Sequence, residues 1–218
     1  MSRLTAGFED RAQGAQQLAE RLQAYRDKNP LILAIPRGAV PMGRIIAELL
    51  GGQLDVVLVR KVASPFNPEF ALGAVDEDGN LFLNPHTSSS GADAAAIAAE
   101  KARQMAVIKA RRASYLPQHA PISPAGRIVI VVDDGIATGA TMIAALKSVR
   151  AKNPKKLICA TPVAAADSLQ DVADYADEVV CLQMPDNFMA VGQFYRDFPQ
   201  VSDEEVKEEL GAAGGDSP

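Results

Sequence analysis

The sequence predicts an α/β protein whose core is a doubly wound parallel sheet of five strands. Five short runs are almost entirely apolar and lack the polar alternation of a strand with one solvated face. Such runs are typical of strands that are buried on both faces, and helical patterns separate them along the chain. The runs are LILAI (31–35), LDVVLVR (54–60), RIVIVV (127–132), KLICAT (156–161) and EVVCL (178–182).

The first half of the chain supplies two helices around the first strand. Residues 8–27 repeat apolar side chains at helical spacing among charged ones, which predicts an amphipathic helix. The strand over 31–35 ends in a Pro-Arg-Gly loop, and the helical pattern over 42–50 stops at two glycines.

A loop, a hairpin and a long helix are expected after the second strand. The segment VASPFNPEF (62–70) is rich in proline and small residues, so we expect a flexible loop there. ALGAV and NLFLN flank DEDG, which predicts a hairpin with Asp78-Gly79 in its turn. An Ala-rich helix should follow over roughly 92–116.

The second half continues the alternation of strands and helices. Helices are predicted over 140–150 and near 166–175, and an irregular segment over 184–198 should form a small hood. Ser202 before a run of acids is typical of a helix N-terminus. Without an internal linker, we expect one domain over 1–210 and a disordered tail over 211–218.

Composition limits the function classes. The chain has 218 residues and a net charge of −5, which argues against a surface that coats nucleic acid. Neither an apolar signal core nor a membrane-length apolar stretch is present. The two cysteines match no zinc spacing. We therefore expect a cytoplasmic protein that binds neither nucleic acid nor a membrane.

The stretch RIVIVVDDGIATGATMIAAL joins a buried strand to a helix through two carboxylates and a loop of small residues. Small residues let backbone N–H groups approach a ligand, and the first turn of the helix favours an anion. The hydroxyls of Thr138 and Thr141 add donors, which predicts a cradle for a phosphate. Asp133 and Asp134 are acceptors that could hold the vicinal hydroxyls of a sugar. Together these groups predict a site for a ribose 5-phosphate, although a simple capped connection gives a similar pattern.

Other loops should join this site. In parallel sheets ligands bind beyond the carboxyl ends of the strands, where the loop at Arg37 and the pair Arg60-Lys61 are also expected. No GxGxxG follows a strand, and the Walker-like glycine spacing that begins at Gly38 lacks the Lys and Ser/Thr that a phosphate loop requires.

VIVVDDGIATGAT resembles the PRPP-binding signature of the type I phosphoribosyltransferases, where PRPP is phosphoribosyl pyrophosphate. IPRGAVP resembles the family's first loop, whose backbone binds pyrophosphate and which often holds a cis peptide, here expected at Arg37-Gly38. Arg60-Lys61 resembles the pair of the orotate and adenine enzymes. MPDNFMAVGQFY resembles the base-binding hood of the hypoxanthine-guanine enzymes, with Phe188 at the position that stacks on a purine.

Departures from the family pattern narrow the choice of acceptor base. Ala137 replaces the acid that the hypoxanthine-guanine enzymes use on the base, and the lysine that they carry after the next strand is absent from KLICATPVAAAD. The insertion over 86–125 is longer than a minimal member needs. The chain as a whole is most similar to the group of predicted phosphoribosyltransferases within the family.

The resemblance implies a pentosyltransferase that moves 5-phosphoribosyl from PRPP to a nitrogenous base, purine or pyrimidine, with Mg²⁺ as cofactor and a homodimer as the assembly. Mg²⁺ would be held by substrate oxygens and would reach Asp133 or Asp134 only through water. If the base needs proton transfer, Glu69, Asp76 and Glu77 are candidates. The implied catalytic residues are Arg37, Arg60, Lys61, Asp133 and Asp134, and the implied substrate-binding residues are Gly38, Gly135, Ala137, Thr138, Gly139, Ala140, Thr141 and Phe188.

Two other functions remain open from the sequence. A non-catalytic regulator could keep the site as a PRPP or nucleotide sensor, but it would not need the basic pair Arg60-Lys61. A PRPP synthetase has a similar signature, but the chain is short for that duplicated architecture.

Overall fold

The computed structural model describes residues 7–64, 66–67, 71–84, 93–117 and 120–213. The chain divides into two compact units, one formed by Met1–Val57 with Ala120–Pro218 and the other by Leu58–His119. The predicted domain over 1–210 remains a prediction.

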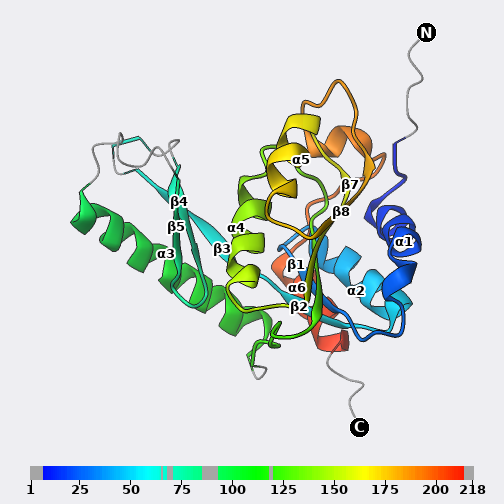
Figure 1. Ribbon diagram of the computed structural model, residues 1–218, viewed down its shortest axis with the longest axis horizontal. Helices are drawn as coiled ribbons and strands as arrows, with labels where there is room; N and C mark the ends of the chain where they lie inside the picture. The colour runs from blue at the N-terminus through cyan, green and yellow to red at the C-terminus, as the bar shows by residue number, and fades with distance from the viewer. Residues whose placement is uncertain (1–6, 65, 68–70, 85–92, 118–119, 214–218) are drawn as a thin grey trace. The chain divides into compact units, whose positions relative to one another are not determined.

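The first unit holds a five-stranded parallel sheet in the order β2-β1-β6-β7-β8, which confirms the predicted fold class (Figure 1). Chain order departs from spatial order because β1 lies between β2 and β6. The central strands are almost entirely buried, as their apolar sequences predict. The strands are β1 (Leu31–Ala34), β2 (Gln53–Val56), β6 (Ile128–Val132), β7 (Lys156–Val163) and β8 (Glu178–Gln183).

Helices cover both faces of this sheet (Figure 1). One face carries α1 (Arg11–Arg21), followed by the short turn η1 (Gln23–Tyr25), and α2 (Ala39–Leu50). The other face carries α4 (Ala140–Arg150) and α5 (Ala166–Ala173). The Asp10 carboxylate accepts from the backbone N–H of Gln13 and so caps α1.

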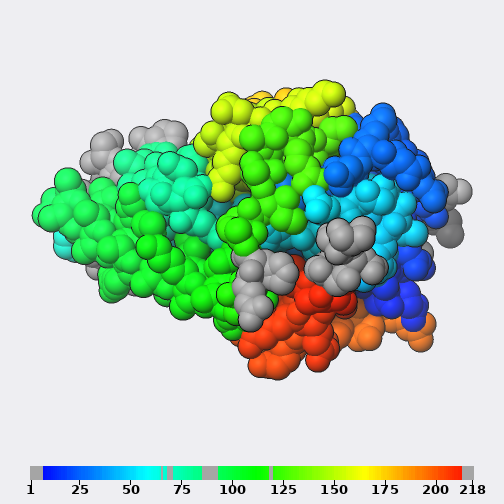
Figure 2. Space-filling view, turned by 90° about the horizontal axis from the view of Figure 1, so that it is seen from below, coloured from blue at the N-terminus to red at the C-terminus, as the bar shows by residue number. Residues whose placement is uncertain are grey.

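The last helix, α6 (Asp203–Ala213), packs on α2 and β2 and forms part of the surface in Figure 2. The Ser202 hydroxyl accepts from the Glu205 backbone N–H at 3.1 Å, and the Glu205 carboxylate accepts from the Ser202 N–H at 2.6 Å. This capping box confirms Ser202 as the start signal.

The second unit is a three-stranded antiparallel sheet with one long helix. Its order is β3-β4-β5, and α3 packs on β3 and β4. The predicted hairpin is confirmed as β4 and β5, and the predicted long helix as α3. The elements are β3 (Val59–Ala63), β4 (Ala71–Asp76), β5 (Leu81–Leu83) and α3 (Ala94–Tyr115).

One expectation about strands is wrong. The run 54–60 is not a single strand, because its first part pairs with β1 and its last part pairs with β4 of the other sheet. The parallel ladder stops where Ala34 meets Val56, since β1 ends there. Arg60 and Lys61 therefore lie within β3 and not at the end of a strand of the parallel sheet. Among the described residues, no helix is long and apolar enough to cross a membrane.

Candidate functional site

Two loops leave the parallel sheet side by side at its carboxyl edge. Ala34, the last residue of β1, pairs with Val132, the last residue of β6. After Ala34 the chain enters the Pro-Arg-Gly loop, which is called the first loop. After Val132 it continues into Asp133 and Asp134. A Cβ built on Gly38 would lie 1.9 Å from the Asp134 Oδ2 atom. The first loop and the acidic pair are therefore in direct contact, and position 38 has no room for a side chain.

The first loop runs from β1 into the N-terminus of α2. Its cis peptide bond joins Pro36 and Arg37, so the expectation of a cis bond at Arg37-Gly38 is wrong by one residue. Gly38 instead has helical φ and ψ of −58° and −31° and is the N-cap of α2. Among the described residues no side chain caps this helix. The Val40 N–H donates to the Arg37 carbonyl at 3.1 Å, and the N–H groups of Gly38 and Ala39 are left for a ligand.

The second loop ends at the N-terminus of α4, which also lacks a side-chain cap. Gly139 is the N-cap with φ of +73°, a left-handed conformation that favours glycine. Thr138 and Thr141 beside it are exposed. The Ser168 hydroxyl donates to the Ala137 carbonyl at 2.6 Å and holds the loop from α5. Among the described residues no side chain occupies the first N–H groups of α4, and two exposed hydroxyls lie beside them. Phosphate binding at this turn stays a prediction.

The carboxylate of Asp134 is held by an arginine from the other end of the chain. Arg11 on α1 donates from Nε at 3.0 Å, and its Nη2 lies 2.9 Å from the same oxygen. Arg11 also donates to the Pro199 carbonyl at 2.7 Å, and its guanidinium lies 3.7 Å from the centre of the Phe198 ring. Asp134 is thus already part of a structural ion pair.

Asp133 has a different environment. Among the described residues no basic side chain forms an ion pair with it, and its Oδ1 accepts from the Asp134 backbone N–H at 2.9 Å. Burial raises the pKa of Asp133 well above its ordinary value, and the neighbouring charge of Asp134 raises that pKa further. Burial also raises the pKa of Asp134, although Arg11 opposes this shift. Between the two acids, Asp133 is the one whose carboxylate lacks a cation.

The hood segment, residues 184–198, packs against the loop that carries Asp133 and Asp134. The Tyr195 hydroxyl donates to the Asp134 carbonyl at 2.7 Å, and the Tyr195 ring packs on Phe8 at 5.4 Å between centres. A Cβ on Gly135 would lie 2.3 Å from a methyl carbon of Val191, in the short helix η3 (Val191–Phe194). Tyr195 and Val191 of the hood therefore pack directly against the acidic loop, and position 135 has no room for a side chain.

Phe188 lies in the same hood, as predicted. Its ring is half-buried and lies 5.1 Å from the ring of Phe194. Phe188 packs against a cluster that includes Phe8 and Val163. Stacking on a base remains a prediction for this residue, since the packing already uses part of its surface.

The remaining predicted residues are placed as follows. Arg37 lies at the start of α2 and approaches Asp203 at 3.9 Å, with about a third of its side chain exposed. In β3, Arg60 donates from Nε to Gln104 of α3 at 2.6 Å, and Lys61 is exposed. Successive strand residues point to opposite faces, so Arg60 and Lys61 cannot act from the same face.

The candidates for proton transfer have structural partners. The Asp76 carboxylate accepts from the backbone N–H groups of Asp78 and Asn80 at 3.0 and 2.8 Å, which shapes the hairpin turn. Glu77 forms a bidentate pair with Arg112, with both distances 2.7 Å. Glu69 lies outside the described residues. The described acids of the hairpin therefore have folding roles, and their catalytic role stays a prediction.

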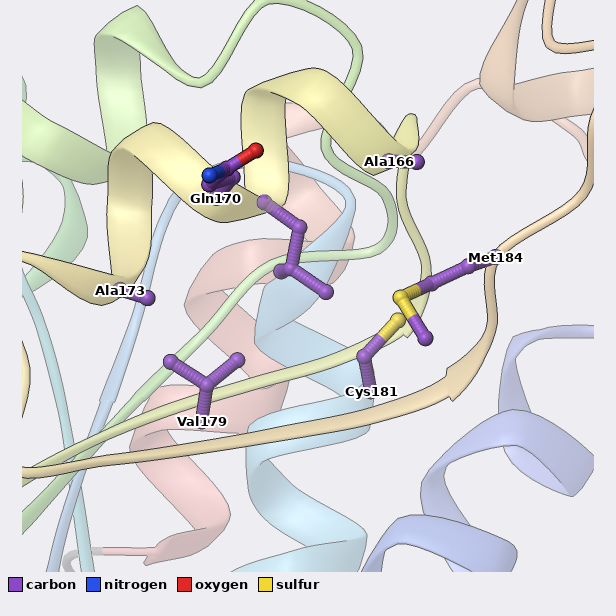
Figure 3. A pocket seen from close by; sticks show the side chains of 7 residues that line it. Ala166, Gln170, Ala173, Val179, Cys181 and Met184 are labelled. Carbon is purple, nitrogen blue, oxygen red and sulfur yellow. The ribbon is translucent and has the colours of Figure 1, made fainter.

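A separate apolar pocket of about 350 Å³ lies between α5 and β8 (Figure 3). Val179 and Cys181 reach into it from β8, and Met184 closes one end. None of its lining residues is charged, and the Gln170 amide is the one strong hydrogen-bond donor among their side chains, so this pocket offers mainly apolar packing surface. Its lining residues are Ala166, Leu169, Gln170, Ala173, Val179, Cys181 and Met184.

Sequence reasoning missed two residues of the acidic loop's support, Arg11 and Tyr195. Arg11 lies 123 positions before Asp134 in an amphipathic helix, where a charged residue is ordinary. Tyr195 lies in the hood sequence, where an aromatic residue is expected to pack. No local pattern in the sequence signals either contact.

The geometry can now be compared with known proteins. The family model described as the phosphoribosyl transferase domain matches residues 8–199, which is most of the chain. The chain belongs to the phosphoribosyltransferase family. The matched range includes both loops, both acids and the hood, and it leaves out the C-terminal helix α6.

Relatives of this family member agree with the assignment. Two Mycobacterium tuberculosis proteins, from strains CDC 1551 and H37Rv, are each named "Putative phosphoribosyl transferase". Each is 44% identical over 200 residues, which is 91% of this chain and 45% of the relative. The chain thus spans less than half the length of these curated relatives.

A solved structure supports the fold. The crystal structure of TT1426 from Thermus thermophilus is 43% identical and has a TM-score of 0.86, covering 96% of this chain and all of that one. A hypoxanthine-guanine phosphoribosyltransferase from Bacillus anthracis, at 14% identity and a TM-score of 0.45, is too distant to inform the choice of base.

Proposed function

We propose that the protein transfers a 5-phosphoribosyl group from PRPP to a nitrogenous base and releases pyrophosphate. The observation that carries this proposal concerns α2 and α4, which follow the adjacent strands β1 and β6. Both helices begin without a side-chain cap among the described residues. PRPP has phosphate groups at both ends of its ribose, and each uncapped N-terminus favours one anion. The α4 turn suits the 5-phosphate, and the first loop with Gly38 suits the pyrophosphate.

The acidic pair lies between these two anion positions. A carboxylate accepts hydrogen bonds from the ribose hydroxyls, and Asp133 has no cation competing for its oxygens among the described residues. Asp134, held by Arg11, fixes the backbone of the same loop. We therefore assign diol binding chiefly to Asp133 and positioning of the loop to Asp134.

In the proposed reaction a nitrogen of the base bonds to ribose C1 while the bond from C1 to pyrophosphate oxygen breaks. The leaving pyrophosphate keeps the electron pair, and the proton of the base leaves to solvent. Arg37 and the Gly38 N–H would stabilise the charge that develops on pyrophosphate. The catalytic role of Arg60 and Lys61 stays a prediction from the family resemblance, and their opposite orientations on β3 allow at most one of them to face a given phosphate group.

The residues present fit the Mg²⁺ that the family resemblance implies. Asp133 offers a carboxylate that has no cation partner among the described residues. Such a site fits an ion that is held mainly by substrate oxygens, with Asp133 or Asp134 reached through water. Mg²⁺ would supply charge neutralisation on the pyrophosphate. By the same resemblance we propose a cytoplasmic homodimer.

The proposal is tested by calorimetry with PRPP and Mg²⁺, followed by pyrophosphate release with a panel of purine and pyrimidine bases. We expect saturable PRPP binding and release with at least one base. Binding without release for any base would replace the transferase with a PRPP sensor. Absence of binding would overturn both functions.

A pair of variants localises the binding. Thr138→Val with Thr141→Val removes two donors from the cradle and should weaken PRPP binding roughly 10- to 100-fold, at about 1 kcal/mol or slightly more for each hydrogen bond. Ser123→Ala removes a hydroxyl at the opposite edge of the sheet, where it accepts from the Ala125 N–H. This control should leave the affinity for PRPP unchanged.

A further inference from the structure

A second pocket, which is polar, lies at the amino edge of the parallel sheet. The acidic pair lies at the other end of β6. Its volume is about 300 Å³. Arg127 precedes β6 and Asp133 follows it, so six residue steps of roughly 3.3 Å separate the two sites by about 20 Å. The pocket is lined by Lys28, Asn29, Gly126, Arg127, Ile128 and Lys155.

Three of these lining residues are basic and none is acidic. In a chain with a net charge of −5, such a cluster is opposite to the average charge of the molecule. Acids do occur near this edge, and each has a cation nearby. Asp27 beside Lys28 is exposed and lies 4.0 Å from Arg26. Asp177 pairs with Arg150 at 2.8 Å and Glu178 pairs with Lys156 at 2.7 Å.

Arg127 is the anchor of the pocket. Its guanidinium donates to the Gln53 Oε1 at 2.6 Å and to the Asn29 carbonyl at 2.8 Å. A longer bond of 3.2 Å reaches the Asn29 Oδ1. All of these acceptors are neutral, so no carboxylate among them compensates the charge of this guanidinium. The side chain of Arg127 is half-buried, and this partial burial lowers its pKa.

These contacts fix Arg127 and still leave donors. A guanidinium has five N–H groups, and the contacts with Gln53 and Asn29 use only part of them. The side-chain oxygen of Asn29 is engaged by Arg127, so its amide N–H groups remain as further donors. Lys28 and Lys155 add two ammonium groups, and neither forms an ion pair among the described residues. The Lys28 Nζ lies 6.0 Å from the centre of the Tyr25 ring.

We infer that this amino-edge pocket binds a small, multiply charged phosphate anion. A fixed guanidinium flanked by two lysines recognises phosphate through charge-assisted hydrogen bonds. Three cations without an acid favour a pyrophosphate-type group over a single carboxylate. This site is separate from the proposed PRPP site and does not depend on that function.

The test is a titration of the isotope-labelled protein with pyrophosphate at low ionic strength, followed by backbone amide NMR. Pyrophosphate is also expected at the carboxyl edge, so the two sites are read from different amides. We expect saturating shifts at Gly126, Arg127 and Lys155. Shifts at 138–141 report the proposed PRPP site independently, so either site can fail without the other. Inorganic phosphate, with less charge, should bind the amino edge more weakly.

A double variant and a control variant distinguish a specific anion-binding site from lysines that are only solvated. Lys28→Gln with Lys155→Gln removes two charges without touching the contacts of Arg127, and it should weaken amino-edge binding at least roughly tenfold. The shifts at 138–141 should keep their affinity. Lys109→Gln, an exposed lysine-to-glutamine change on α3, is the matched control. Shifts at the amino edge that are absent, that fail to saturate, or that are the same in the double variant would overturn the inference.

Discussion

Replacing Arg11 with methionine should destabilise the protein by about 4 kcal/mol at neutral pH. The side chains of Arg11 and Asp134 are only 12% and 17% exposed, so Arg11→Met leaves a desolvated carboxylate without its cation. Breaking a buried pair from one side costs about 3–5 kcal/mol, and the small remaining exposure places this pair at the low end. The lost bond to the Pro199 carbonyl and the lost contact with the Phe198 ring add about 1 kcal/mol.

The assay is urea unfolding, with an equal slope required for wild type and variant. Arg196→Met is the matched control, because Arg196 pairs with Glu9 at 3.1 Å with side chains 78% and 56% exposed. A surface pair of this kind contributes less than about 1 kcal/mol. Equal losses in Arg11→Met and Arg196→Met would refute the burial argument.

A double-mutant cycle isolates the pair from the other contacts of Arg11. Asp134→Asn removes the charge that Arg11 neutralises, so adding it to Arg11→Met should recover part of the loss. We expect a coupling energy of about 1–3 kcal/mol. Additive losses would mean that Arg11 acts only through Pro199 and Phe198.

Three further predictions follow from other features. Gly38→Ala should cost about 1–3 kcal/mol and weaken PRPP binding, because the new Cβ collides with the Asp134 carboxylate; unfolding and calorimetry measure both, and an unchanged variant would refute the contact. Asp133→Asn should stabilise the protein near pH 7 but not below about pH 4. The raised pKa means that the neutral Asp133 contributes stability in acid that is lost as the pH rises, and a pH-independent difference in unfolding free energy would contradict this. Burial raises the pKa of Cys181 to about 11 and also raises that of Cys159, so neither thiol should react rapidly with a disulfide reagent at pH 8 in the folded chain, whereas both should react in urea.

The parallel sheet could be predicted from the sequence because its strands are buried on both faces. Residues such as Ile130 and Val131 have no solvated side, and continuous apolar runs are the direct consequence. The α4 turn was equally accessible, since its glycine and threonines are adjacent in the chain. Local chemistry of this kind needs no knowledge of distant contacts.

Features that depend on distant segments could not be predicted. The run 54–60 is largely apolar, and only the length of β1 decides that its pairing ends at Val56. The partner of Asp134 is a residue of α1, and nothing near either residue specifies it. The amino-edge pocket brings Lys28, Arg127 and Lys155 together from three loops, which requires the strand order.

Arg11 and Tyr195 both hydrogen-bond to Asp134, and these contacts affect the order in which the protein folds during synthesis. A ribosome releases Arg11 early, but the Pro199 carbonyl that Arg11 binds emerges 188 residues later, shortly after Tyr195. All five strands of the parallel sheet have left the ribosome before then, whereas the loop at Asp134 must wait for these last supports. A nascent chain from which β8 has emerged but Tyr195 has not would therefore contain every strand of the sheet without the contacts that hold the carboxyl edge.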